Sequence, residues 1–263
     1  MKPINLFRQY CGTKILKEIT ALDIAEIIDS IKVLGHSRMA QVVRMVLIDV
    51  FKEAQHAGYV PPGYNPAKAT KQPRNRVKRE RMTLDEWRTI YQQAKNHPPY
   101  LQCGMLLALT TGQRIGDICK MKFSDIWDDM LHIQQEKTGS KLAIPLSLKC
   151  EAINLSLRDV VAQCRDAVVS KYLVHYRHTT AQAKRGEQVT PNTLTTTFKK
   201  ARDKCGLTWE KGTAPTFHEQ RSLSERLYRE QGINTQKLLG HKTQNMTDKY
   251  HDDRGKEWQI IAV

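Results

Sequence analysis

A strongly basic segment without apolar periodicity divides this sequence and limits the folds that the chain can adopt. Residues 68–81, KATKQPRNRVKRER, hold seven basic residues and one acidic residue, which leaves a net charge of +6. Such a run supplies no buried face, so we expect two folded segments, 1–67 and 79–263, joined by a linker over 68–78. The charge favours nucleic-acid contact, and a solvated connector is the alternative interpretation.

The composition indicates a folded protein with a polyanionic partner. Of 263 residues, 42 are Lys or Arg and 27 are Asp or Glu, so the formal net charge is +15, and 40% are hydrophobic. That fraction is enough for a core, and no apolar run approaches the ~18 residues of a membrane span. Because the N-terminus lacks an apolar signal region and six scattered cysteines form no Cys-x-x-Cys pair, we expect reduced thiols in a cytoplasm.

The segment before the linker is predicted to be helical. In residues 20–33 isoleucines recur at helical spacing, and Thr20 and Asp23 occupy capping positions. Residues 37–57 carry a second apolar stripe, and Gly58 and the following prolines end it. We therefore expect only about two helices before the linker.

The segment after the linker is predicted to be mainly helical with one small antiparallel sheet, which is the α+β class. Thr83 and Glu86 form a capping box for a helix to about Ala94, and residues 100–110 form a buried helix. MLHIQQ and KLAIPL alternate around EKTGS, as in a β-hairpin. Further helices are expected near residues 148–175, 190–205, 216–231, 233–239 and 243–250, before a short apolar strand at 258–263.

Common catalytic and cofactor motifs are missing from the sequence. There is no glycine-rich phosphate loop, so nucleotide binding has no support. His218-Glu219 begins like a zinc-protease motif, but Ser222 stands where the second histidine belongs. Adjacent pairs such as Asp128-Asp129 point apart and do not suit a two-metal nuclease. We therefore expect neither a cofactor nor a metal.

Basic residues near helix ends are the remaining candidates for chemistry. Thr216 and Glu219 predict a capping box and a helix from Phe217, which places His218 and Arg221 on one face near its N-terminus. An arginine and a histidine at a helix N-terminus suit phosphate binding. A surface pair bonded to local acids is the alternative interpretation.

Five further residues are weak candidates when each is taken alone. Arg114 follows a glycine break, and Asp117 lies one helical turn later, where a simple salt bridge is the alternative. Lys137 lies in the hairpin turn and could be merely solvated. His241 follows a predicted helix end and Tyr250 comes nine residues later, where core packing is the alternative.

These candidates occur together within five motifs, in the order TTGQRIGDICKMKFSDI, EKTGSKLAIP, TFHEQRSLSERLY, LLGHK and KYHDDRGKEW. In these motifs the sequence resembles the tyrosine recombinase family, and most closely the integrases of lambdoid phages. The similarity extends from about residue 79 to residue 258. It implies a tyrosine recombinase catalytic fold over 79–263 with a tail strand, preceded by a partial helical core-DNA-binding domain over 1–67.

The resemblance implies that Tyr250 attacks a DNA phosphodiester, forms a 3′-phosphotyrosine and frees a 5′-hydroxyl. Arg114 and Arg221 would bind the non-bridging oxygens, since guanidinium groups stabilise the charge that develops there. Lys137 would protonate the departing 5′-oxygen, and His241 would donate a hydrogen bond to the phosphate.

Two further roles and a set of DNA contacts also follow from the resemblance. His218 would take the tyrosine proton or hold the phosphate, and Asp117 would orient Arg114 without acting as a catalyst. Contacts to the DNA backbone, which fix position without reading bases, are expected from Arg74, Arg76, Lys78, Arg79, Lys122 and Lys242.

The implied function is site-specific recombination for phage or prophage integration and excision, without metal or ATP. The expected partners are double-stranded attachment sites, three further copies in a homotetramer, a host DNA-bending protein and an excisionase, all at the nucleoid of a bacterial host. The tail over 258–263 would pack between subunits. Two alternatives remain: a type IB topoisomerase-like enzyme, and a truncated non-catalytic attachment-site-binding remnant suggested by the short N-terminal segment.

Overall fold

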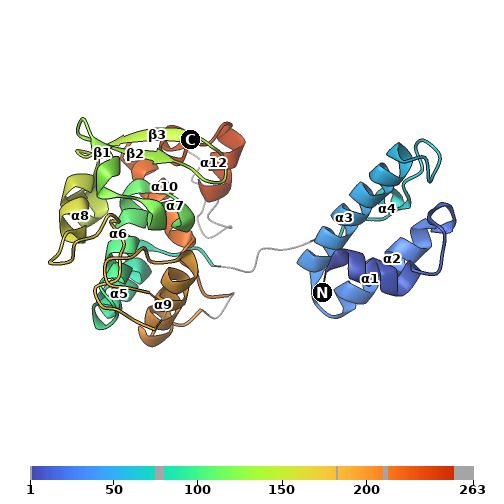
Figure 1. The fold of residues 1–263 in the computed structure, drawn as a ribbon, viewed down its shortest axis with the longest axis horizontal. Coiled ribbons are helices and arrows are strands. Elements are labelled where there is room, and N and C mark those ends of the chain that lie inside the picture. The colour runs from blue at the N-terminus through green and yellow to red at the C-terminus, as the bar shows by residue number, and fades with distance from the viewer. Residues whose placement is uncertain (1, 75–79, 182, 210–212, 252–263) are drawn as a thin grey trace, which may run out of the picture. The chain divides into compact units, whose positions relative to one another are not determined.

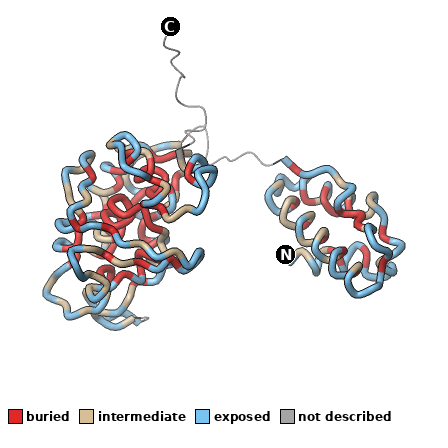
Figure 2. Tube along the Cα trace, turned by 90° about the horizontal axis from the view of Figure 1, so that it is seen from above, coloured by how far each residue is buried: buried red, intermediate tan, exposed pale blue. Residues whose placement is uncertain are grey.

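Two compact units make up the computed structural model, which describes residues 2–74, 80–181, 183–209 and 213–251. Unit 1 is Met1–Val77 and unit 2 is Lys78–Val263, so the boundary falls within the basic segment. Each unit has its own hydrophobic core, and Figure 2 shows the two sets of buried residues. No described helix is long and apolar enough to cross a membrane.

Unit 1 contains α1 (Pro3–Cys11), α2 (Ala21–Val33), α3 (Ser37–His56) and the single turn α4 (Pro66–Ala69) (Figure 1). The helices predicted over 20–33 and 37–57 correspond to α2 and α3, and Thr20 forms its capping box with Asp23. The expectation of only about two helices is wrong. Because α1 buries just Phe7 and Cys11, and α4 is one turn long, neither gives a periodic signal in the sequence.

Unit 2 is built around α6 (Tyr100–Thr111), an apolar helix buried on nearly all sides. Helices α8 (Leu157–Cys164), α9 (Pro191–Lys204) and α10 (Glu219–Glu230) pack against it, which explains why its sequence lacks a polar face. The mainly helical class with small antiparallel sheets is confirmed. The other α-helices described in this unit are α5 (Leu84–Gln93), α7 (Ile115–Lys120), α11 (Thr235–Leu239) and α12 (Gln244–His251).

An antiparallel sheet lies beside α7 in unit 2 (Figure 1), with strand order β1 (Ile126–Trp127), β2 (Met130–Gln134), β3 (Lys141–Pro145). The predicted hairpin is confirmed as β2 and β3, and Leu131 pairs with Ile144 on the buried face. The turn between them includes Gly139 at φ +69°. A second pair, β4 (Lys149–Cys150) and β5 (Leu155–Ser156), follows.

The predicted helix near 148–175 is wrong over most of its length, since only α8 is α-helical there. Asn154, at φ 53°, turns β4 into β5, and Ser156 then caps α8 in a capping box with Asp159. After Cys164 the chain takes a non-helical path. The Asp166 carboxylate holds that path by bonding to His175 and Arg177, nine and eleven positions later, and such bonds give no signal in helical periodicity.

Candidate active site

Arg221 lies in the first turn of α10, and its side chain is almost wholly buried, with 1% exposed. Nη1 donates to the carbonyl of Gly112 at 2.6 Å, and Nη2 donates to the carbonyl of Leu239 at 2.8 Å. Within the described chain the buried Nε has no hydrogen-bond partner. Burial and the nearby charge of Arg114 lower the pKa of Arg221 to about 10, so the guanidinium is charged at neutral pH.

Arg114 occupies the N-cap position of α7, just after the chain leaves α6. Gly112 makes this break at φ +63°, where a Cβ would lie 2.8 Å from Leu239 Cδ2. The Arg114 side chain is partly exposed, and its Nη1 donates to Oε1 of Gln135 at 3.1 Å. Arg114 is thus held by a side-chain amide, and Arg221 is held by two backbone carbonyls.

His241 follows α11, which ends at Gly240 in the left-handed region with φ +65°. Its Nε2 lies 3.0 Å from Arg221 Nη2, and its Nδ1 lies 3.0 Å from Thr247 Oγ1. Burial, and then the charges of Arg221 and Arg114, lower the pKa of His241 to about 4. The imidazole is therefore neutral at pH 7, with Nε2 accepting from Arg221 and Nδ1–H donating to Thr247.

Tyr250 lies near the end of α12 and faces both of these groups. Its ring is stacked on that of His241, with centroids 5.3 Å apart, and Arg221 Cζ lies 5.4 Å from its centroid. The backbone is held at this point, because Ser222 Oγ donates to the Tyr250 carbonyl at 2.7 Å. Arg81 Nη2 donates to the preceding carbonyl, that of Lys249. A phenol is thus brought next to a buried arginine.

His218 is exposed at the N-cap of α10, and its ring centroid lies 6.0 Å from that of Tyr250. The predicted start at Phe217 is wrong, because α10 begins at Glu219. The predicted capping box is also wrong, since the buried carboxylate of Glu219 contacts Arg81 Nη1 at 3.1 Å. The ion pair between Glu219 and Arg81 takes the place of the predicted local cap, and His218 still lies beside Tyr250.

Lys137 is exposed in the turn between β2 and β3. Among the residues that the structure describes, none forms a hydrogen bond or ion pair with its ammonium group. The turn itself is ordered by backbone bonds from Gln135 N to Ser140 O at 2.9 Å and from Gly139 N to Gln135 O at 2.8 Å. The backbone at Lys137 is therefore fixed by the turn, while its side chain is able to move.

Asp117 does not orient Arg114 directly, which corrects the sequence-based expectation. Its Oδ1 accepts from the backbone N–H of Glu136 at 2.9 Å, next to the turn that carries Lys137. The contact to Arg114 comes instead from Gln135, a residue that the motifs did not single out. The spacing of one helical turn along α7 favoured Asp117 as the partner of Arg114, whereas the actual partner is the side-chain amide of Gln135, which lies directly after β2.

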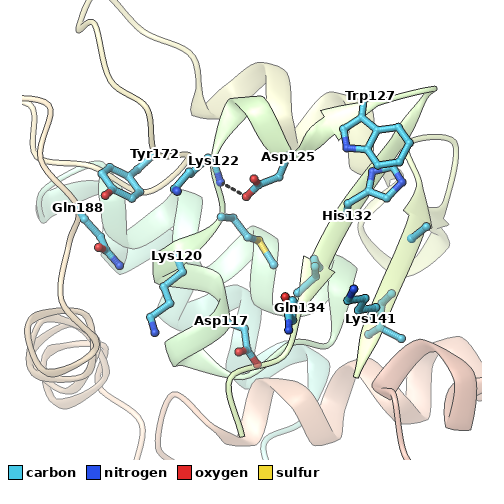
Figure 3. A pocket seen from close by; sticks show the side chains of 14 residues that line it. Asp117, Lys120, Lys122, Asp125, Trp127, His132, Gln134, Lys141, Tyr172 and Gln188 are labelled. Atoms are coloured by element: carbon cyan, nitrogen blue, oxygen red, sulfur yellow. Dashed lines mark hydrogen bonds between the residues drawn. The ribbon is translucent and has the colours of Figure 1, made fainter. Parts of the chain in front are cut away.

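The predicted DNA-backbone contacts fall partly within the described structure. Arg74, Lys122 and Lys242 are exposed, and the positions of Arg76, Lys78 and Arg79 lie outside the described residues. Lys122 lines a pocket of about 700 Å³ next to the sheet, where Lys120, Trp127 and His132 also project (Figure 3). Of the candidate active-site residues only Asp117 lines this pocket, so the basic cluster around Tyr250 is a separate site.

Metal ligands do not gather in the described part of the chain, where no group of three or more His, Cys, Asp or Glu could hold an ion. The available chemistry is that of two guanidinium groups, a neutral imidazole and a phenol. Such a set binds a phosphodiester and presents a nucleophile to it.

This fold and a tyrosine beside buried basic groups define the class of tyrosine recombinases. The sequence matches the phage integrase family over residues 80–257. It is 74% identical over 262 residues to the integrase of Enterobacteria phage P21, covering 100% of this chain and 69% of that protein.

Two solved structures support the same assignment. A lambda integrase(75–356) dimer bound to a COC′ core site has a TM-score of 0.90 at 37% identity, covering 99% of this chain and 89% of that one. A lambda integrase tetramer bound to a Holliday junction has a TM-score of 0.89 at 37% identity, covering 99% and 72%. The chain belongs to the phage integrase family and is a site-specific recombinase of phage or prophage type.

Proposed function

We propose that this integrase cleaves and rejoins DNA through Tyr250, without a metal ion or ATP. The Tyr250 oxygen attacks the phosphorus, the bond to the 5′-oxygen breaks, and a 3′-phosphotyrosine and a 5′-hydroxyl form. The reverse attack by a 5′-hydroxyl reseals the strand, because the phosphotyrosine retains the energy of the original bond. The observation that carries the proposal is the contact of Tyr250 with Arg221 and His241.

The basic residues stabilise the extra charge of the pentacoordinate phosphate. Arg221 offers its Nε, and Arg114 offers the guanidinium N–H groups that do not donate to Gln135; within the described residues none of these N–H groups has a partner. Lys137 moves in from its turn to protonate the leaving 5′-oxygen, and His218 accepts the tyrosine proton. His241 donates to the phosphate once the anion enters, since a nearby negative charge raises a histidine pKa.

The partners of this chain are proposed from its relatives. Lambda integrase binds a core DNA site and forms a tetramer on a Holliday junction. We propose double-stranded core sites and a homotetramer for this chain, acting in the host cytoplasm on nucleoid DNA, with unit 1 and unit 2 as core-binding and catalytic domains. The predicted tail contact of residues 258–263 lies outside the described residues.

Covalent capture in a chelator tests the reaction. The protein is mixed in EDTA with supercoiled plasmid that carries a core site, trapped with detergent and assayed for protein-linked DNA beside Tyr250→Phe. We expect linkage in the wild type, none in Tyr250→Phe, and normal linkage in Tyr59→Phe, a change at an exposed tyrosine of unit 1. Linkage that persists in Tyr250→Phe, or that requires added Mg²⁺, would contradict the proposal.

A further inference from the structure

Gln135 lies directly after β2, and its side chain is buried, with 1% of the residue exposed. Its Oε1 accepts from Arg114 Nη1 at 3.1 Å and from Thr138 Oγ1 at 2.6 Å. Its Nε2 donates to Gln113 Oε1 at 2.7 Å and to the Leu239 carbonyl at 2.9 Å. The amide therefore makes four hydrogen bonds, two through each of its polar atoms.

These bonds connect the segments that carry the active site. The Leu239 carbonyl that accepts from Gln135 also accepts from Arg221 Nη2 at 2.8 Å. The next residue, Gly240, approaches so closely that a Cβ there would lie 2.9 Å from Gln135 Nε2. One amide thus touches the start of α7, the turn before His241 and the turn that carries Lys137.

The position of the Arg114 guanidinium depends on its hydrogen bond to Gln135 more than the position of the Arg221 guanidinium depends on any one of its hydrogen bonds. In the part of the chain that the structure describes, the only hydrogen bond of the Arg114 side chain is the one to Gln135. Arg221 has two carbonyl acceptors of its own. A long, partly exposed arginine has many rotamers, so a fixed acceptor decides where its guanidinium stands.

We infer that Gln135 is a positioning residue that holds Arg114 ready for the scissile phosphate. This inference rests on the proposed function, since it names the group that orders one of its two arginines. Only an amide satisfies all four partners: a carboxylate lacks donors for Gln113 and Leu239, and an aliphatic side chain offers nothing to Arg114. Preorganised donors contribute most when they need no rearrangement during the reaction.

Single-turnover covalent capture on the same core-site plasmid in EDTA tests the inference, with Gln135→Met as the main variant. We expect linkage to slow by about ten- to hundredfold, as for a misplaced catalytic group, with the plasmid Kd unchanged. Gln135→Glu keeps the size of the side chain and is expected to slow linkage as well, so it decides the matter if Gln135→Met unfolds. Gln134→Met, an exposed neighbour that faces the pocket in Figure 3, is the control and keeps the wild-type rate.

A double-variant comparison separates positioning from a general structural effect. If Gln135 acts through Arg114, adding Gln135→Met to Arg114→Ala should change the remaining rate by less than about threefold. If the rate effects of Gln135→Met and Arg114→Ala multiply, or if a folded Gln135 variant links DNA at the wild-type rate, the inference about Gln135 is wrong. The proposed function would still stand. A wild type that forms no linkage would overturn the proposed function and the inference with it.

Discussion

Nη2 of Arg221 and Nε2 of His241 lie 3.0 Å apart, so the histidine accepts a hydrogen bond from the arginine. This arrangement requires a neutral imidazole, which agrees with a pKa of His241 near 4 caused by burial and the two arginines. Phosphate binding must then change the role of Nε2 from acceptor to donor.

The first prediction concerns this histidine. The pKa of His241 is about 4 in the folded protein and 6.5 for an unperturbed histidine, so the unfolded chain binds more protons between these values. The contribution of His241 to stability is therefore fully present above pH 6.5 and is lost as the pH falls toward 4. Urea unfolding from pH 4.5 to 7.5 should show a weaker pH dependence in His241→Gln. If His241→Gln and the wild type show the same pH dependence of the unfolding free energy, the low pKa of His241 is refuted. His56→Gln, a change at an exposed histidine, is the control and should keep the wild-type pH dependence.

The second prediction concerns the geometry of Arg221. Arg221→Lys keeps the charge but loses donors that reach both Gly112 and Leu239. We expect DNA linkage to slow by about a hundredfold or more, as when other charge-stabilising donors are removed. Arg229→Lys, an exposed change on the same helix, should have little effect. Equal rates in the two variants would show that charge alone is enough.

The third prediction concerns the backbone that carries the nucleophile. Ser222 Oγ donates to the Tyr250 carbonyl, and Ser222→Ala removes that bond. A hydrogen bond contributes about 0.5–1.5 kcal/mol, so we expect linkage to slow by up to about tenfold. Ser224→Ala is the matched control, because in the described structure its buried Oγ has no partner. A larger kinetic defect in Ser224→Ala would contradict this account of Tyr250 positioning.

The fourth prediction separates backbone strain from steric clash at the glycine before Arg114. Gly112 and Gly139 both have positive φ, but of these two only Gly112 would bring a Cβ against other atoms, Leu239 Cδ2 at 2.8 Å and Ser224 Oγ at 3.0 Å. Strain should cost each alanine variant about 1–2 kcal/mol of unfolding free energy. The clash should cost Gly112→Ala about 1–3 kcal/mol more. Chemical denaturation measures both, and equal losses would contradict the close packing.

The fifth prediction concerns the basic linker. Arg74→Gln, or the same change at Arg76, should weaken plasmid binding and reduce the slope of log K against log salt by about 0.9 for each phosphate that the linker no longer neutralises. Lys52→Gln removes a lysine that already pairs with Asp49 and serves as the control. Linker variants with an unchanged slope would favour a merely solvated connector.

The sequence was sufficient to predict the residues whose position depends on local geometry. Arg114 follows a helix that ends at glycine, and His241 follows a second helix that ends at glycine, so each turn is encoded by its own residues. The main helices, the hairpin and the α+β class were predicted for the same reason. Their periodic apolar faces and capping residues lie within a few residues of one another.

Long-range contacts explain what the sequence did not reveal. Gln135 meets Leu239 across 104 positions, and Glu219 is drawn from its expected cap by Arg81 across 138 positions. An isolated glutamine has no pattern that indicates four partners. The non-helical path after α8 depends on bonds of medium range, from Asp166 to His175 and Arg177, which form only in the folded chain.

The central claim is that Tyr250 forms the bond to DNA, and peptide mapping of the trapped complex tests it most directly. After nuclease treatment and trypsin digestion, mass spectrometry locates the residue that carries the remaining nucleotides. We predict the nucleotides on the peptide over residues 250–254, attached through Tyr250, with free 5′-hydroxyl groups on the released DNA ends. Nucleotides on any other tyrosine, or attachment through a 5′-phosphate, would contradict the account.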